Sequence, residues 1–247
     1  MAELDLGKVV GRDGTIVKRN LLDNSDFRNP VNQRGKSSYT ANGYTIDRWF
    51  NQSDATTTVN SGSITVTGLI MQRLLSAAKG GVYTLAVCNA GGDVMILDTH
   101  GWDNDASCYY VEFGNGEYVW AALYEGEYTA ETLPEYVPKG YAAELMECMR
   151  YYQTLPRLTM PIPTGETVIP GRQFYMPMRI PPTIHVYDDQ GAASAVTYWD
   201  SNAGLTHGVT VSQVVAVGNS GIKYLHVATA ATSVCRATYY VTASADL

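Results

Sequence analysis

Turn-forming residues divide this 247-residue chain into short runs rich in Val, Thr, Ile and Tyr, at intervals of about 8 to 12 residues. Such runs favour strands, and the Asn, Asp and Gly clusters between them tolerate the backbone angles of tight turns. Ala55 to Val66 fits a hairpin that turns at Asn60-Ser61-Gly62, and Tyr109 to Leu123 fits a second one that turns at Gly114-Asn115-Gly116. The pattern predicts a mainly β fold, either a sandwich or a barrel.

The pattern changes to the period of a helix between Tyr141 and about Gln153. Apolar side chains recur there at an i, i+4, i+7 spacing, and the run contains no Gly or Pro. Pro156 is expected to end the element, because proline cannot continue a helix. We therefore expect one amphipathic helix whose apolar stripe packs on a β-layer.

Strand signals return after the helix. Val209 to Val217 and Lys223 to Thr229 are joined by Asn219-Ser220-Gly221, which predicts a hairpin, and Ala237 to Thr242 is the last predicted strand. The predicted organisation has four parts: an N-terminal tail or shaft remnant over residues 1–19, a β-sandwich over 20–138, a connecting helix within 139–155 and a C-terminal β-domain over 156–247.

Charge and cysteine content argue against several classes of protein. The formal charge is -7 and no cluster of Lys and Arg is present, so we expect no nucleic acid as a partner. No segment approaches the ~20 apolar residues of a membrane span, and the N-terminus lacks the pattern of a signal peptide. The cysteines are too widely spaced for a zinc ribbon or a redox pair, and we expect buried thiols at Cys88, Cys108, Cys148 and Cys235.

Catalytic motifs are missing from the sequence. It has four histidines, but no G-x-S-x-G elbow, H-E-x-x-H pair or Walker loop. The densest polar loop offers Asp98, Asp103 and Asp105, together with His100, as weak candidate ligands of a hard cation. Their spacing matches no established ligand scheme, so a solvated loop without a metal is favoured. We predict that the protein is not an enzyme.

Aromatic residues suggest a binding surface, because exposed rings on a β-scaffold are a common platform for sugars. Trp102 and Trp199 lie in stretches rich in Asp, Asn and Gly, which favours exposure. Trp49 and Trp120 have apolar strand neighbours, so we expect them in the core. The candidate carbohydrate-binding residues are Trp102, Tyr109, Tyr110 and Trp199.

Three groups of residues occur in an order that matches one known family. The first is Asn20-Leu-Leu-Asp-Asn-Ser-Asp-Phe27, followed by Asn32-Gln-Arg-Gly35 and Tyr44-Thr-Ile-Asp-Arg-Trp49. The second is Tyr136-Val-Pro-Lys139 with Glu144-Leu-Met-Glu-Cys-Met-Arg-Tyr-Tyr152. The third is Met178-Arg-Ile-Pro-Pro-Thr183, with the ending Ala243-Ser-Ala-Asp-Leu247. Together they resemble the C-terminal receptor-binding region of bacteriophage and prophage tail fibres, over residues 20–247.

This resemblance implies a jelly-roll β-sandwich of the galactose-binding type, followed by the helix and a smaller β-domain. It also implies a tail-fibre tip that attaches the virion to a bacterial surface glycan or protein without catalysis. Such tips are commonly homotrimers that contact other tail-fibre proteins, and they are made in the bacterial cytoplasm before they act on the virion tail. Modules of this fold often hold a structural calcium near a Glu after Asp-Phe. Arg28 follows Phe27 here, so no cofactor is expected.

Two other functions stay open beside receptor binding. A structural tail or baseplate component would use its exposed aromatic side chains to contact other virion proteins. A glycan-degrading tail protein is the third alternative, but such proteins usually have long β-helices, and no short repeat of that kind is visible. The leading hypothesis is a receptor-binding module whose ligand is a saccharide.

Overall fold

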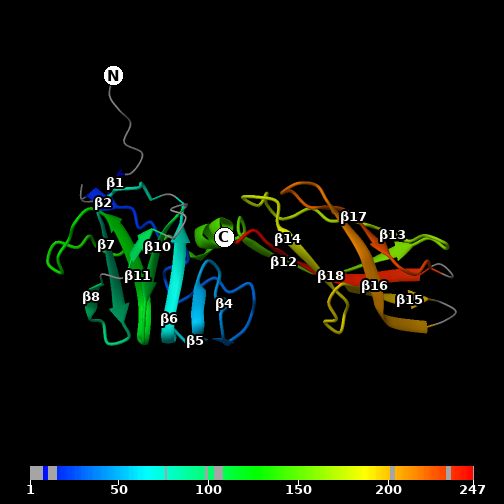
Figure 1. Ribbon diagram of the computed structural model, residues 1–247, viewed down its shortest axis with the longest axis horizontal. Helices are drawn as coiled ribbons and strands as arrows, with labels where there is room; N and C mark the ends of the chain where they lie inside the picture. The colour runs from blue at the N-terminus through cyan, green and yellow to red at the C-terminus, as the bar shows by residue number, and fades with distance from the viewer. Residues whose placement is uncertain are drawn as a thin grey trace, which may run out of the picture. The chain divides into compact units, whose positions relative to one another are not determined.

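The protein folds into two compact units, Met1–Leu145 and Met146–Leu247, and the boundary falls inside a helix (Figure 1). The computed structural model describes residues 8–10, 16–75, 77–97, 100–102, 108–200, 204–231 and 235–246. Both units consist of antiparallel strands in a sandwich-like arrangement, so the predicted mainly β fold is confirmed. Across these described ranges, no helix combines the length and the apolar character that crossing a membrane would need.

The segment predicted as a tail contains two short strands. β1 (Lys8–Val10) and β2 (Ile16–Lys18) pair with each other in an antiparallel hairpin. Neither strand has a further pairing partner among the described residues. The hairpin therefore forms a small element of its own ahead of the main sheet.

One antiparallel sheet of nine strands makes up most of the first unit. Its order is β3-β5-β6-β11-β7-β8, with β4 beside β5 and with β10 between β6 and β9. The predicted hairpin at Asn60-Ser61-Gly62 is confirmed, because it joins β5 to β6 and Gly62 has a φ of 91°. The strands are β3 (Ser38–Thr40), β4 (Gly43–Tyr44), β5 (Phe50–Val59), β6 (Ile64–Leu74), β7 (Tyr83–Asn89), β8 (Val94–Leu97), β9 (His100–Trp102), β10 (Tyr109–Phe113) and β11 (Gly116–Glu125).

The second predicted hairpin, at Gly114-Asn115-Gly116, is wrong. Within the described residues β10 and β11 do not pair with each other; both pair antiparallel with β6, β10 along residues 70–74 and β11 along residues 64–66. The chain continues in one direction through Gly114 and Asn115. The amide oxygen of Asn115 accepts a hydrogen bond from the Gly68 backbone N–H at 2.8 Å and holds this bend against β6. Gly and Asn suit a bend as well as a turn, and only the long-range pairing distinguishes the two.

The core of the first unit is one cluster of buried apolar side chains from the sheet strands and from the segment before them. Trp49 is fully buried, as predicted, and its ring meets Phe27 and Phe113 edge-on at 5.4 and 5.3 Å between centroids. Trp120, also predicted in the core, is instead half-buried and stacks flat on Tyr136 at 4.6 Å. All four cysteine thiols of the chain are buried, as predicted.

Residues of the first and second motif groups contribute to a hydrogen-bonded network around the buried Asn24. Its side-chain oxygen accepts from the Val31 backbone N–H at 2.7 Å, and its amide donates to the carbonyls of Val31 and Asp47, both at 2.8 Å. The Trp49 indole N–H donates to the Asn24 carbonyl, and the Glu144 carboxylate accepts from the Asn24 backbone N–H. These motif residues therefore act as scaffold, because they join loops that are far apart in the sequence.

The helix is shorter than predicted. α1 (Tyr141–Cys148) ends five residues before Gln153, and β12 (Tyr152–Ile162) begins soon after it. Gln153 is buried, and its amide donates to the carbonyls of Met149 and Met176 at 2.9 and 2.7 Å. Its buried environment and these hydrogen bonds hold the residue in a strand, although its apolar neighbours continue the helical period.

Pro156 lies inside β12 and does not end the helix. The pairing of β12 with its neighbour shifts register between Leu155 and Leu158, and proline suits such an irregularity because it has no N–H to donate. Within the described residues β12 pairs on one side only, so it is an edge strand. Prolines at positions 156 and 161 discourage further strands from adding to that edge.

The second unit is a seven-stranded antiparallel sheet in the order β12-β18-β15-β16-β17-β13, with β14 also paired to β18. The hairpin predicted at Asn219-Ser220-Gly221 is confirmed, and so is the last strand. Alternate residues of that strand, from Cys235 to Ala243, are buried in the core of the unit. Besides β12, the strands are β13 (Val168–Pro170), β14 (Thr183–Tyr187), β15 (Ala195–Asp200), β16 (Gly204–Ala216), β17 (Ile222–Val227) and β18 (Cys235–Ser244).

Candidate functional site

One concave surface of the first unit brings together two of the predicted sugar-binding residues. Its volume is about 600 Å³, within the range of roughly 300 to 1,000 Å³ that is usual for ligand sites. We call it the Trp102 groove. Its lining includes Asn42, Phe50, Gln52, Met71, Arg73, Trp102, Tyr110 and Glu112.

Strand register explains why these side chains converge. Tyr110 of β10 lies opposite Arg73 of β6, and Glu112 lies opposite Met71. Phe50 of β5 also lies opposite Met71, from the other side of β6. Directly opposed residues of an antiparallel sheet share a face. Since the alternate residues of β10 are buried, Tyr110 and Glu112 stand on the face turned away from the core. Trp102 of β9 lies opposite the buried Tyr109 and packs partly against the core, while it also lines the groove.

Several polar atoms of the groove have no hydrogen-bond partner among the described residues. The Gln52 amide donates to the Glu112 carboxylate at 2.5 Å, which holds the two side chains together. The Gln52 carbonyl oxygen, the Tyr110 hydroxyl and the Trp102 indole N–H make no hydrogen bond to any residue that the structure describes. The groove therefore offers both donors and acceptors to a ligand rich in hydroxyl groups.

The four predicted aromatic residues do not form one platform. Tyr110 and Trp102 line the groove, and the Tyr110 ring lies against Gly101, where an added methyl group would stand 3.4 Å from its hydroxyl. Tyr109 is only 4% exposed, so it belongs to the core. Its ring packs edge-on against the Trp102 ring, with 5.5 Å between the ring centroids. Trp199 belongs to the second unit.

Sequence reasoning did not assign the groove residues that lie within strands to a binding site. Gln52, Arg73 and Glu112 have no loop context or motif that marks them. The signal that was present is the alternation in Tyr109 to Phe113, which places Tyr110 and Glu112 on the same face of a strand. The partners on β5 and β6 follow only from the strand register.

The predicted metal candidates Asp98, Asp103 and Asp105 lie outside the described residues. At the position where the resemblance points to calcium, Arg28 donates from its Nε to the Asp26 carboxylate at 2.6 Å. Its guanidinium also lies 5.8 Å from the Tyr136 ring centroid. The chain itself thus supplies a cation to the acidic residue of the Asp-Phe motif.

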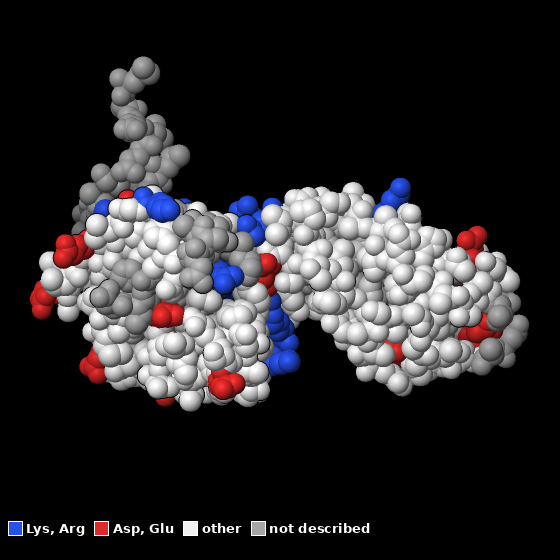
Figure 2. All heavy atoms as spheres, in the orientation of Figure 1, with Lys and Arg blue, Asp and Glu red and all other residues white. Residues whose placement is uncertain are grey.

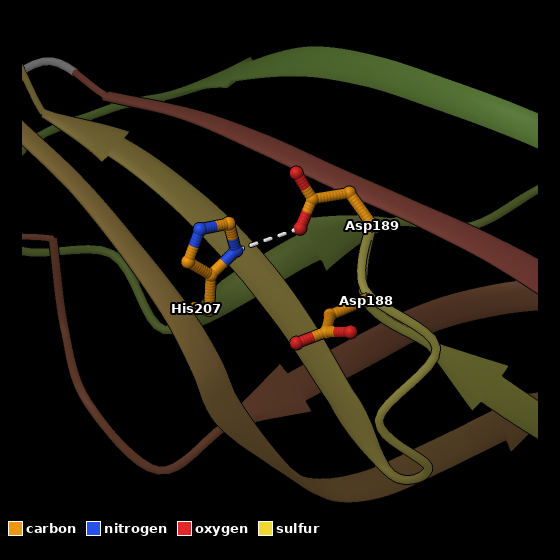
Figure 3. A group of neighbouring side chains, drawn as sticks. All are labelled: Asp188, Asp189 and His207. Atoms are coloured by element: carbon orange, nitrogen blue, oxygen red, sulfur yellow. Dashed lines mark hydrogen bonds and ion pairs between the residues drawn. The ribbon is translucent and has the colours of Figure 1, made fainter.

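A second polar cluster, in the second unit, consists of Asp188, Asp189 and His207 (Figure 3). His207 Nδ1 lies 2.8 Å from the Asp189 carboxylate, and Thr197 donates its hydroxyl proton to the same carboxylate. The Thr197 hydroxyl is 3.4 Å from His207 Nδ1. In a nucleophilic triad the carboxylate and the hydroxyl bond different nitrogens of the histidine. Here both approach Nδ1, so the geometry does not activate the threonine.

The Asp188 carboxylate is occupied by backbone groups. It accepts hydrogen bonds from the N–H groups of Gln190, Ala192 and Gly208, at 3.0, 2.8 and 3.0 Å. These bonds join the loop after β14 to β16. We therefore interpret the cluster as a structural staple that holds the loop after β14 to β16.

This staple predicts that the second unit loses stability in acid. Burial raises the pKa of Asp188, but the three backbone hydrogen bonds outweigh it and leave the pKa below its ordinary value. A depressed carboxyl pKa contributes stability above the unfolded value of about 4, which is lost as the pH falls through the folded value. Melting from about pH 6 to about pH 3 should show this loss, and Asp188→Asn should reduce the slope. Equal slopes for the two proteins would contradict the staple.

Comparison of this chain with family models, with curated proteins and with solved structures finds no match.

Proposed function

We propose that this chain is a receptor-binding module of a phage tail fibre and that it binds a bacterial surface saccharide in the Trp102 groove, without catalysis. The observation that carries the proposal is one groove that combines aromatic rings with polar atoms that make no hydrogen bond to a described residue. A sugar presents an apolar C–H face that stacks on rings and a rim of hydroxyl groups that hydrogen-bond. Trp102 and Tyr110 suit the face, and Gln52 and Glu112 suit the rim.

The tail-fibre assignment is supported by the ordered motifs of residues 20–247. Their residues meet in one buried network around Asn24, as expected for residues that maintain a scaffold while the surface varies. The proposal includes a homotrimeric state, contacts with other tail-fibre proteins and a location on the virion tail. No nucleic acid takes part in it.

The absence of catalysis is supported by the lining of the groove. Glycoside hydrolysis uses a pair of carboxyl groups on the two sides of the scissile bond. Among the described residues of the lining, Glu112 is the one carboxylate. The side chain of Glu112 also bonds Gln52, which suits a binding role.

Replacement of Trp102 by Ala is expected to weaken glycan binding about tenfold or more, because a ring buried under a bound sugar typically contributes over 1 kcal/mol. Tyr110→Phe removes one hydroxyl and should cost about fivefold. An array of bacterial surface glycans would identify the ligand, and calorimetry would then compare the variants.

Tyr175→Ala is the matched control, because it removes a ring that is 59% exposed and lies in the second unit. It should leave affinity unchanged. If no bacterial glycan binds the oligomer, or if the Trp102 and control variants bind equally well, the groove is not the receptor site. A structural role in the virion would then replace the proposal.

A further inference from the structure

The second unit carries an exposed tryptophan in the middle of a sheet. Trp199 of β15 is 48% exposed, whereas its neighbours Tyr198 and Asp200 are buried. The indole ring therefore faces outward at the end of β15, where burial alternates over residues 198–200. Tryptophan is largely buried in most folded proteins, so a ring held half in solvent suggests a contact with a ligand.

Cross-strand register surrounds this ring with a defined set of side chains. Leu205 of β16 and Arg236 of β18 lie directly opposite Trp199 on its two sides, and both are exposed. Two residues along β18 from Arg236, and so on the same face, the hydroxyls of Thr238 and its β12 partner Thr159 lie 2.9 Å apart. We call these five residues the Trp199 face. It presents an aromatic ring, a guanidinium and two hydroxyls on one side of the sheet.

Arg236 gives this face its charge. Its guanidinium carbon lies 5.8 Å from the centroid of the Trp199 ring, in a cation–π contact. No carboxylate of the described residues forms an ion pair with it. A guanidinium is planar and binds carboxylates through two parallel hydrogen bonds. An anionic group that reaches Trp199 therefore meets a cation that no carboxylate of the described residues neutralises.

The distribution of charge between the units favours the same conclusion. The first unit holds 18 acidic and 11 basic residues, which accounts for the whole net charge of -7, and the second holds six of each. Figure 2 shows acidic side chains at several separate places on the visible face of the first unit. An anionic polymer is repelled by the first unit and not by the second.

We infer that the Trp199 face is a second saccharide-binding surface, which takes sugar residues that carry a carboxylate. The Trp199 ring stacks on the sugar, and Arg236 binds its carboxylate. The hydroxyls of Thr159 and Thr238 bind hydroxyl groups of the same oligosaccharide. The inference shares with the proposed function only that the ligand is a saccharide. It uses none of the residues of the Trp102 groove.

The test uses the full chain and an array of oligosaccharides that contain uronic acids. Each oligosaccharide is printed beside the same molecule with its carboxyl groups reduced to alcohols. We expect binding to members of the acidic set at least about tenfold stronger than to their reduced partners. Raising the salt from about 50 to about 500 mM should weaken this binding, because salt screens exposed charges. A chain that binds no acidic member, or binds both forms equally, overturns the inference.

Variants locate the binding on the molecule. Trp199→Ala should abolish binding to the acidic set, and Arg236→Gln should abolish the preference over the reduced set, whereas Trp102→Ala should change neither. Tyr175→Ala controls for the loss of an exposed ring in the same unit. If acidic glycans lose binding with Trp102→Ala alone, the face is not a separate site. If Trp199→Ala changes the oligomeric mass and acidic glycans never bind, the face joins copies of the chain and the inference is wrong.

Failure of this inference is distinguishable from failure of the proposed function. Binding of neutral glycans that depends on Trp102, with no acidic preference, would support the groove and reject the Trp199 face. Binding of acidic glycans that depends on Arg236, with no effect of Trp102→Ala on any glycan, would support the Trp199 face and reject the Trp102 groove.

Discussion

Replacement of Asn24 by Ala is expected to lower the free energy of unfolding of the first unit by about 3 to 5 kcal/mol. The change removes three side-chain hydrogen bonds and leaves the buried N–H of Val31 and C=O of Asp47 without those partners, while the Val31 C=O keeps its bond from the Asp47 N–H. Each unsatisfied buried group costs roughly 1 to 3 kcal/mol. Asn24 also has a φ of 50°, which alanine adopts less readily than asparagine.

A second substitution separates these two causes. Asn24→Gly keeps the positive φ and loses the same hydrogen bonds, so it should be less destabilised than the alanine variant by about 1 kcal/mol. Urea unfolding followed by tryptophan fluorescence measures both, since Trp49 lies in the affected core. The exposed Asn29 provides the matched control, and Asn29→Ala should change stability by less than about 0.5 kcal/mol. A loss at Asn24 as small as that would show that the network is not a stabilising element.

Replacement of Gly171 by Ala is expected to destabilise the second unit by more than about 3 kcal/mol, through a clash between backbones. A Cβ at this position would overlap the carbonyl of Ile222 and would lie 2.6 Å from the carbonyl carbon of Lys223. The two segments cannot separate freely, because Gly171 donates its N–H to the Lys223 carbonyl and Ile222 donates to the Arg172 carbonyl. Backbone atoms, unlike the end of a flexible side chain, have little room to move aside.

Hydrogen exchange measured by mass spectrometry would localise this effect. Peptides that contain β13, β16 and β17 should lose protection in Gly171→Ala. β13 and β16 both pair with β17, which begins at Ile222, the residue in close contact with Gly171. Gly114→Ala is the control, since that glycine has no positive φ and an added methyl group would meet its nearest atom at 3.5 Å. Equal protection in the two variants would mean that the backbones at Gly171 and Ile222 can move apart, contrary to the prediction.

The local turn signals of the sequence were reliable where one turn joins strands that pair with each other. The hairpins at Asn60-Ser61-Gly62 and Asn219-Ser220-Gly221 are of this kind. At Gly114-Asn115-Gly116 the same residue types mark a bend, because the pairing energy comes from β6 and not from the neighbouring strand. The predicted end of the helix was wrong for a related reason, since the hydrogen bond of Gln153 to the distant Met176 carbonyl and its burial outweigh the helical period.

Among the candidate site residues, too, local sequence context predicted the burial of some correctly and of others wrongly. Exposure of Trp199 and burial of Trp49 agree with their local contexts in the sequence. Tyr109 was predicted to bind sugar, but it is buried. The alternation of β10 places Tyr109 inward and Tyr110 outward. Choosing between adjacent tyrosines requires the phase of the alternation, and a shift of one residue exchanges the two faces.

The amino-acid sequence by itself determined the mainly β class of this protein, its two β-rich parts with a helix between them and the buried position of Trp49. Turn chemistry and side-chain burial are properties of short segments, so these features can be predicted from neighbouring residues. Only the tertiary structure decided that Gln52, Arg73 and Glu112 share a groove with Trp102, and that Arg236 lies beside Trp199. Such neighbours are set by the register of strands far apart in the chain, and that register depends on the packing of the whole sheet.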